Sequence, residues 1–299
     1  KIKMKLYNIK YILTLIVVML CVQVQVQGQQ DPSFTMYQLN MNLINPAYAG
    51  SSDGLELTTM IKSQFTGIEN SPTTQTLSLS SPVGRNLGLG LSIVNDQVFV
   101  AKETDVYVDF SYKLQLSEST NLFLGVKGGV SFFSVDLTSL DINDPLFDQN
   151  VNRTNPNFGA GAYLKGENYY ASLSVPVLLE SKRYEKEGNT VTRASDKPHI
   201  YLGAGYTFDL KNDYKLKVTP SFMTRYVSGV PLSLDVTATV GLLDKVEFGV
   251  SHRLQESFSG LLMFQFIKEF KLGYAYQHAT NDISKYSNGS HEVIFKFNF

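Results

Sequence analysis

The sequence contains no tryptophan, a single cysteine and few charged residues, which make up 18% of its 299 positions. The one cysteine, Cys21, lies in an apolar stretch near the start, so the remaining chain can form no disulfide and offers no thiol chemistry. Long apolar runs are scarce as well, and a bundle of transmembrane helices would need several runs of about 20 residues. The formal net charge of -1 argues against a nucleic-acid partner, which normally requires a basic patch.

The first residues have the pattern of a secretory signal peptide. Four lysines among the first ten residues precede an apolar run over residues 11–22, and a small residue, Gly28, follows. This pattern predicts a signal peptide over residues 1–28, with cleavage near Gly28. The run is short for a transmembrane anchor. Leu20 before Cys21 disfavours a lipoprotein signal, which would have a small residue at that position.

Aromatic residues and glycine are abundant, with 19 Phe, 17 Tyr and 22 Gly. From residue 55 onward, apolar positions alternate with polar ones. In residues 232–242, for example, the even positions are Leu, Leu, Val, Ala, Val and Leu, and the odd positions are Ser, Asp, Thr, Thr and Gly. A period of two held over this length indicates β-strands rather than helices. The sequence therefore predicts an all-β protein.

About fourteen such runs follow one another, an even number, and each is near the length of about 9–11 residues with which a tilted strand crosses a bilayer. The expected strands are residues 55–67, 73–83, 87–97, 103–116, 121–135, 156–165, 168–176, 199–209, 214–226, 231–242, 245–253, 259–267, 269–278 and 290–299. Tight turns follow the second, fourth, sixth and eighth runs, and the long connections 136–155, 177–198 and 279–289 all follow odd-numbered runs. Long loops at one end and tight turns at the other are typical of outer-membrane barrels. A soluble β-sandwich would scatter its long loops over both ends.

One face of these strands is polar and the other is apolar. The polar face carries Asp109, Lys113, Lys217, Arg225, Asp235, Glu247, Arg253 and Lys296. The pattern does not show which face lies inside, but the loop asymmetry and the signal peptide favour a transmembrane antiparallel β-barrel over residues 55–299, with its apolar face outside. The last run ends with Val293, Phe295, Phe297 and Phe299 on one side. We expect it to close the barrel, with Phe299 in the aromatic girdle at the membrane interface.

The segment from residue 29 to residue 50 reads QQDPSFTMYQLNMNLINPAYAG. It resembles the start of the PorP/SprF family, outer-membrane proteins of the type IX secretion system of Bacteroidota. Other stretches that match are Ser71-Pro72, NLGLG at 86–90, NDP at 143–145, PNFG at 156–159, LSVP at 173–176, GYAY at 273–276 and Ser290-His291-Glu292. The resemblance extends over nearly the whole chain after the predicted signal peptide.

This resemblance implies a protein of the outer membrane that assists export of a secreted partner or holds it at the cell surface, as in delivery of a gliding adhesin. It implies no catalysis and no cofactor. The implied partners are secreted proteins with a C-terminal secretion domain, periplasmic ring or translocon components of the secretion machine, and the lipid bilayer. Residues 29–54 are expected to form a periplasmic or plug segment ahead of the barrel. The alternative is an outer-membrane diffusion channel or hydrophobic-solute transporter, which would need an open lumen.

A candidate docking element for the secretion machine precedes the first strand. It consists of Asn45, Pro46, Ala47, Tyr48, Ala49 and Gly50. The same residues could instead form a capped turn, in which Pro46 restricts φ and Gly50 supplies a positive φ before the barrel begins. Just upstream, the near-helical spacing of Tyr37, Met41 and Ile44 predicts a short helix packed at the periplasmic mouth.

Patterns for catalysis and metal binding are weak, so we predict no enzyme and no metal or cofactor site. No pair of histidines has a spacing typical of a metal site, and the G-x-S-x-G elbow of hydrolases is absent. His291 and Glu292 with a remote serine could imitate a barrel-embedded lipase, but any protein of this size offers such combinations. The mixed-charge residues 180–186 form either a solvated loop tip or a loop that grips a partner. Glycines such as Gly125 and Gly161 are expected to ease strand curvature.

Overall fold

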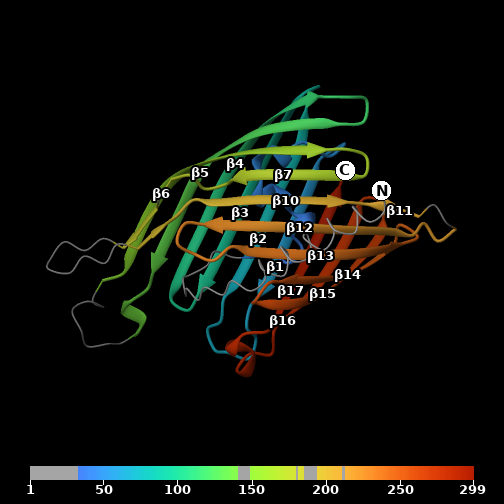
Figure 1. Cartoon of the computed structure of the whole chain (residues 1–299). Coiled ribbons are helices and arrows are strands. Elements are labelled where there is room, and N and C mark those ends of the chain that lie inside the picture. Colours follow the sequence, from blue (N-terminus) through green and yellow to red (C-terminus); the bar gives the residue numbers. More distant parts are fainter. Residues whose placement is uncertain (1–32, 141–148, 180, 185–193, 211–212) are drawn as a thin grey trace, which may run out of the picture.

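The computed structural model describes residues 33–140, 149–179, 181–184, 194–210 and 213–299. Within these residues, 14 antiparallel strands form one closed barrel (Figure 1). The barrel strands are β1 (Glu56–Ser63), β2 (Thr73–Val83), β3 (Leu87–Val98), β4 (Ala101–Gln115), β5 (Asn121–Val135), β6 (Val151–Lys165), β7 (Tyr169–Val175), β10 (His199–Tyr206), β12 (Lys217–Val227), β13 (Ser233–Leu242), β14 (Val246–Arg253), β15 (Ser257–Ile267), β16 (Phe270–Ala279) and β17 (Ser290–Asn298). The predicted signal peptide, residues 1–28, lies outside the described part of the chain.

Three shorter strands accompany the ring. β11 (Phe208–Asp209) continues the barrel sheet beside β12. β8 (Ser181–Tyr184) and β9 (Ala194–Asp196) pair with each other in the long connection after β7. Of the mixed-charge residues 180–186, Ser181–Tyr184 form β8, and residues 180, 185 and 186 lie outside the described part of the chain.

The ring closes where β1 pairs with β17. Glu56 lies opposite Asn298 at one end of this seam, and Ser63 lies opposite His291 at the other. On the far side of the barrel, β10 pairs with both β7 and β12, so each of the 14 described barrel strands has two neighbours. Closure satisfies the backbone hydrogen bonds of a sheet that faces lipid. The predicted transmembrane antiparallel β-barrel of the outer-membrane type is confirmed.

Strand boundaries agree closely with the alternation, and β2 and β5 have the predicted ends. The main difference is β6, which begins at Val151 rather than at Pro156, because β5 and β6 continue as a hairpin up to the pair Val135 and Val151. A proline cannot donate to a β-ladder, yet β6 tolerates Pro156 because its pairing with β7 begins only at Ala160. The connection between β5 and β6 is therefore residues 136–150.

The apolar face of the barrel points outward and the polar face points into the lumen. Val108, Val236 and Phe258 on the outer surface are 55, 48 and 57% exposed, whereas the inward carboxylates of Asp109 and Glu292 belong to residues that are 0 and 1% exposed. The outer surface is thus the lipid-facing band of a membrane barrel. Among the described residues, no helix is long and apolar enough to cross a membrane.

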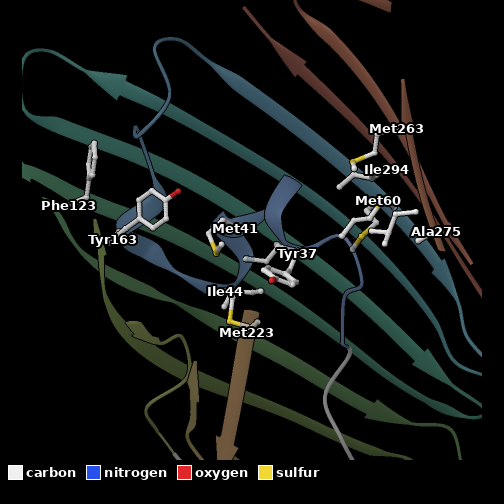
Figure 2. Packing of buried hydrophobic residues seen from close by; sticks show 14 residues of the cluster. Tyr37, Met41, Ile44, Met60, Phe123, Tyr163, Met223, Met263, Ala275 and Ile294 are labelled. Carbon is white, nitrogen blue, oxygen red and sulfur yellow. The ribbon is translucent and has the colours of Figure 1, made fainter. Parts of the chain in front are cut away.

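The lumen is filled by residues 33–50, which we call the plug segment. Its side chains pack against the inner wall of the barrel (Figure 2) and are largely buried. The hydrophobic core lies between the two and consists of Met36, Tyr37, Met41, Leu43, Ile44, Ala47, Met60, Phe123, Tyr163, Met223, Leu261, Met263, Ala275 and Ile294. Apolar side chains inside the barrel therefore serve mainly to hold the plug segment.

We expect Val236→Arg to impair assembly, because a cation on the lipid face near the midplane costs about 2–4 kcal/mol. Ser233→Arg on the same strand is the matched control, since Ser233 borders a cavity in the lumen. The measurement is the fraction of heat-modifiable, folded barrel recovered in lipid vesicles, together with the free energy of unfolding in urea. Equal recovery and equal stability of the two variants would contradict the assignment of the two faces.

Candidate functional site

The plug segment consists of three single-turn helical pieces, η1 (Tyr37–Leu39), α2 (Met41–Ile44) and η2 (Pro46–Tyr48). The third begins with a cap, since the Asn45 side chain accepts a hydrogen bond from the backbone N–H of Ala47 at 2.9 Å and Pro46 occupies the first turn. Gly50 then turns the chain with a φ of 69°. The chain leaves the lumen there and enters β1, so the capped-turn geometry of the sequence motif is present.

Helices this short leave most of their backbone N–H and C=O groups without partners inside the helix. Where these groups are shielded from water, they must bond to the barrel wall or remain unsatisfied, at a cost of about 1–3 kcal/mol each. The wall supplies the partners from charged side chains at three levels. Each level combines a lysine or arginine with a carboxylate from the same or a neighbouring strand.

The end of the barrel that carries the long connections is the outer end in barrels of this type. At this end, Glu292 on β17 accepts hydrogen bonds from the backbone N–H groups of Thr35 and Met36, at 2.9 and 2.8 Å. Lys62 on β1 lies 3.6 Å from the same carboxylate and donates to the carbonyl of Ser33. Both charged side chains are almost completely buried, with 1 and 2% exposure. The side chains at the β1–β17 seam thus bind the start of the plug segment.

A second contact reaches Ser33 from β14. The guanidinium of Arg253 donates two hydrogen bonds to the carboxylate of Asp235 on β13, at 2.6 and 2.8 Å, and a third at 2.6 Å to the hydroxyl of Ser33. Bidentate pairing orients the guanidinium, which leaves its remaining N–H groups aimed into the lumen.

At the middle level, Lys127 on β5 donates to the backbone carbonyls of Asn42 and Leu43, both at 3.2 Å. Its ammonium lies 3.4 Å from Asp109 on β4, and Asp109 accepts a hydrogen bond from the Asn42 side chain at 3.1 Å. Lys127 and Asp109 are directly opposite each other in the strand register. The pair satisfies the C-terminal carbonyls of α2, where a cation is also favoured by the helix dipole.

At the periplasmic level, Lys296 on β17 pairs with Glu56 on β1 at 2.8 Å and donates to the carbonyl of Leu39 at 3.1 Å. The Tyr48 hydroxyl donates to the Glu56 carboxylate at 3.2 Å. Burial raises the pKa of Tyr48 well above its ordinary value, and the neighbouring charge of Glu56 raises it further. Tyr48 therefore remains a neutral donor. Nearby, Lys165 donates to the carbonyl of Ser51 at 2.7 Å, where the chain leaves the lumen.

The structure places the candidate docking motif on the inside of the barrel. Asn45, Ala47 and Ala49 are each 0% exposed. The amide of Asn45 donates to the carbonyl of Ala162 at 2.9 Å and to the Ser172 hydroxyl at 2.8 Å. Asn45, Ala47 and Ala49 thus contact the barrel wall, whereas Gly50 borders the hollow where the chain leaves the lumen.

Three strand glycines make room for this motif. A Cβ at Gly88 would lie 2.1 Å from the carbonyl oxygen of Ala49, one at Gly125 would lie 2.3 Å from the backbone of Ala47, and one at Gly161 would lie 2.0 Å from the Asn45 side chain. These contacts are far shorter than any side chain can adopt. Gly125 and Gly161 are therefore required by the close approach of the plug segment, and their role in strand curvature stays a prediction.

The residues that imitate a catalytic pair lie on opposite faces of β17. His291 points outward and shares a 2.7 Å hydrogen bond with the Tyr274 hydroxyl. Glu292 points inward and binds the plug segment. The two cannot act on one substrate. Within the described ranges, no group of three or more His, Cys, Asp or Glu side chains is placed to hold a metal ion.

The charged residues that bind the plug segment could be predicted only in part from the sequence. Lys296, Asp109 and Arg253 belong to the predicted polar face, but Lys62 and Lys127 were not recognised as functional residues. In the sequence, each of these two lysines can be recognised only as a charged residue on the polar face of an alternating strand. The identity of their partners depends on strand register and on the path of the plug segment, which the alternation does not define.

Comparison with protein families gives one match that covers almost the whole chain. The model of a family described as "Type IX secretion system membrane protein PorP/SprF" matches residues 26–297. No curated protein matches the sequence.

Solved structures with a similar fold are outer-membrane barrels. The CymD monoaromatic hydrocarbon channel has 11% identity and a TM-score of 0.50, over 87% of this chain and 92% of that one. Omp33 of Acinetobacter baumannii has 8% identity and a TM-score of 0.49, over 82 and 98%. A FadL homologue of Pseudomonas aeruginosa has 14% identity and a TM-score of 0.44, over 91 and 96%. At such low identity, the likeness to CymD concerns the fold alone.

We expect Glu292→Ala to destabilise the protein by about 3–5 kcal/mol, because it leaves the buried Lys62 cation without its partner and two backbone N–H groups without an acceptor. The control is Asp282→Ala, which removes an ion pair to Lys285 whose side chains are 93 and 69% exposed. That change should cost less than about 1 kcal/mol. Unfolding in denaturant measures both, and protease cleavage within the plug segment reports its release. Wild-type stability of Glu292→Ala would show that this tie does not hold the segment.

Proposed function

The chain belongs to the PorP/SprF family of type IX secretion system membrane proteins, and from this premise we propose that it is a non-enzymatic accessory of protein secretion in the outer membrane. In this role it assists the export or surface attachment of a secreted partner, such as a gliding adhesin. It binds partners at its two ends and transfers nothing through its lumen. The bilayer is the third partner, which the apolar outer face contacts.

The observation that carries this proposal is the filled lumen. The plug segment is tied to β1, β4, β5, β13, β14 and β17 through buried charged groups, and its small motif fits against three strand glycines. Removing any one partner of a buried pair is costly, so this segment is a fixed part of the barrel. The alternative function, a diffusion channel or hydrophobic-solute transporter, would require an open path where these residues lie.

The periplasmic rim offers a surface for components of the secretion machine. A polar hollow of about 590 Å³ lies where the plug segment leaves the lumen. Its lining includes the charged residues Asp53, Arg85, Lys113, Glu118, Lys165 and Glu167. Rim charges of both signs favour specific pairing with a complementary surface over general adhesion. The motif at residues 45–50 supports this contact indirectly, by fixing where the chain emerges at the rim.

The outer end supports contact with the secreted protein that carries a C-terminal secretion domain. Binding residues concentrate on loops held by a rigid scaffold, and the three long connections of the sequence all lie at this end of the barrel. The one catalytic-looking pair, His291 and Glu292, is split between the two faces of β17. These observations support a binding role rather than an enzymatic one.

A permeation measurement tests the closed lumen. Liposomes that contain the purified wild-type protein should not swell faster in an arabinose solution than protein-free liposomes, because the plug segment occupies the lumen. An open general porin at the same protein-to-lipid ratio is the positive control. Rapid swelling with the wild-type protein would favour the diffusion-channel alternative.

A loop replacement tests the outer end. Residues 185–193 are replaced by an Asn-Gly turn, which keeps the strands β8 and β9 and changes the loop-closure entropy only slightly. The barrel should reach the outer membrane in normal amounts, while the secreted partner is lost from the surface and collects in the medium. Cell fractionation and surface proteolysis measure both. Normal barrel levels with every surface protein still in place would show that this loop does not hold the partner.

A further inference from the structure

Three of the four histidines of the chain lie together on the outward surface of the barrel. His252 is on β14, His278 on β16 and His291 on β17, and each is one residue from the outer end of its strand. Because the outward face of the barrel contacts lipid, strand ends on this face lie where the hydrocarbon of the outer leaflet meets its headgroups. We call these three residues the histidine patch.

The strand register makes the patch continuous. Phe258 on β15 lies directly opposite both His252 and His278, so these two histidines flank it, about 10 Å apart at the usual strand spacing. Tyr276 on β16 lies opposite His291. His278 and His291 are therefore diagonal neighbours, about 7–8 Å apart. A single lipid headgroup can contact more than one of the three rings.

The ring of His252 is held in place by its neighbours on β15. It stacks on Phe258, with ring centroids 4.0 Å apart and an interplanar angle of 12°. Its Nδ1 lies 3.1 Å from the carbonyl oxygen of Ser257, and a carbonyl can only accept, so Nδ1 carries a proton. The second nitrogen, Nε2, has no partner in the described part of the protein. In the imidazolium form, which histidine adopts readily near neutral pH, Nε2 is also a donor.

The other two histidines also have nitrogen atoms available. His291 shares its Nδ1 hydrogen bond with the Tyr274 hydroxyl at 2.7 Å, which leaves Nε2 for another molecule. Its ring lies 5.3 Å from that of Tyr276, centroid to centroid. His278 is exposed, and its side chain makes no hydrogen bond to any residue that the structure describes. The patch thus presents three imidazole rings, two of them oriented by neighbours.

No opposing charge shares this face with the histidines. Besides histidine, the outward positions of β13 to β17 are apolar residues, glycine and tyrosine. The carboxylates in the two adjoining outer connections are paired, since Glu256 lies 3.6 Å from Arg253 and Asp282 lies 2.8 Å from Lys285. An anion at the patch is therefore attracted by the imidazolium rings and meets no unpaired carboxylate in these connections.

The arrangement favours a phosphate over a metal ion. The ring of Phe258 separates His252 from His278, and within the described ranges no group of three metal-binding side chains is placed to hold an ion. A terminal phosphate carries up to two negative charges and three strong acceptor oxygens, which suits several N–H donors spread over a surface. The phosphate of a zwitterionic lipid is linked to a cationic group, which the imidazolium rings would repel.

We propose that the histidine patch binds the terminal phosphate of an anionic lipid in the outer leaflet. The Nε2–H groups of His252 and His291 donate to the phosphate oxygens, and His278 adds positive charge from the middle of the patch. The acyl chains lie along the apolar outer face of β14 to β17. A lipid bound in this way fixes the depth of this wall in the membrane. The site requires only the barrel in its bilayer, so it stands apart from the proposed role in secretion.

The sequence contains no tryptophan, so one introduced tryptophan can report on the lipid beside it. Val250→Trp places this reporter two residues before His252 on the same outward face, where Val250 is 66% exposed. Val108→Trp on β4 is the matched reporter, because Val108 is 55% exposed and neither β4 nor its neighbours β3 and β5 contain a histidine. The full-length protein is folded into phosphatidylcholine vesicles, and its fluorescence is measured at about pH 6, where histidine is largely protonated.

Quenching by dibrominated phosphatidic acid, which ends in a phosphate, is compared with quenching by dibrominated phosphatidylcholine. We expect phosphatidic acid to associate about fivefold more strongly beside Val250→Trp and equally beside Val108→Trp, since a few exposed charge contacts change affinity by this order. Replacing all three histidines, with His252→Gln, His278→Gln and His291→Gln in the Val250→Trp background, should abolish the preference. Heat-modifiability shows that each variant is folded.

Equal association of the two lipids beside Val250→Trp would overturn the proposal, as would the same preference at both reporters or a preference that survives the triple histidine replacement. Inorganic phosphate added in excess should leave the preference in place, because the acyl chains keep the lipid phosphate at the level of the patch. Loss of the preference under that condition would overturn the assignment to a lipid. No secretion component is present, so the result is independent of the secretion assays.

Discussion

Hydrocarbon offers no hydrogen-bond partner to a peptide group, and this constraint governs the whole molecule. A sheet that faces lipid must close on itself, so the first strand β1 must find the last strand β17. Closure in turn places one face of every strand in lipid and the other in a lumen. The outer face is accordingly apolar all around, while the charged residues of the strands point inward. The inward polar groups of the strands also need partners, and the plug segment supplies them.

The interior is held by buried charges in addition to the apolar contacts between the plug segment and the barrel wall. The two ion pairs at the closing seam have opposite polarity, since β1 contributes Lys62 and Glu56 while β17 contributes Glu292 and Lys296. A shift of either strand by one residue would turn its two charged side chains to the lipid face, at a high cost. The same groups bond to the backbone of the plug segment. Barrel closure and plug placement are therefore coupled through the same side chains.

This coupling bears on function. Barrels that conduct solutes use their lumen, whereas the lumen of this barrel holds a segment of its own chain. Membership in a secretion family and a filled barrel together favour a role in binding over a role in permeation.

The sequence by itself determined the barrel. A period of two in hydrophobicity, repeated in runs of membrane-crossing length, follows directly from the pleat of a strand with lipid on one side, and so β2 and β5 could be predicted to the residue. The start of β6 was missed because a proline normally ends a strand, and only the short neighbour β7 shows why Pro156 is tolerated there. The plug contacts needed the tertiary structure. Residues such as Lys62 and Glu292 are about 230 positions apart and meet only through strand register, and the need for glycine at Gly125 and Gly161 arises from a segment that crosses the lumen. Alternation reports which solvent a side chain faces, because that depends on local geometry. It does not report which distant side chain lies opposite, because that depends on how the chain closes.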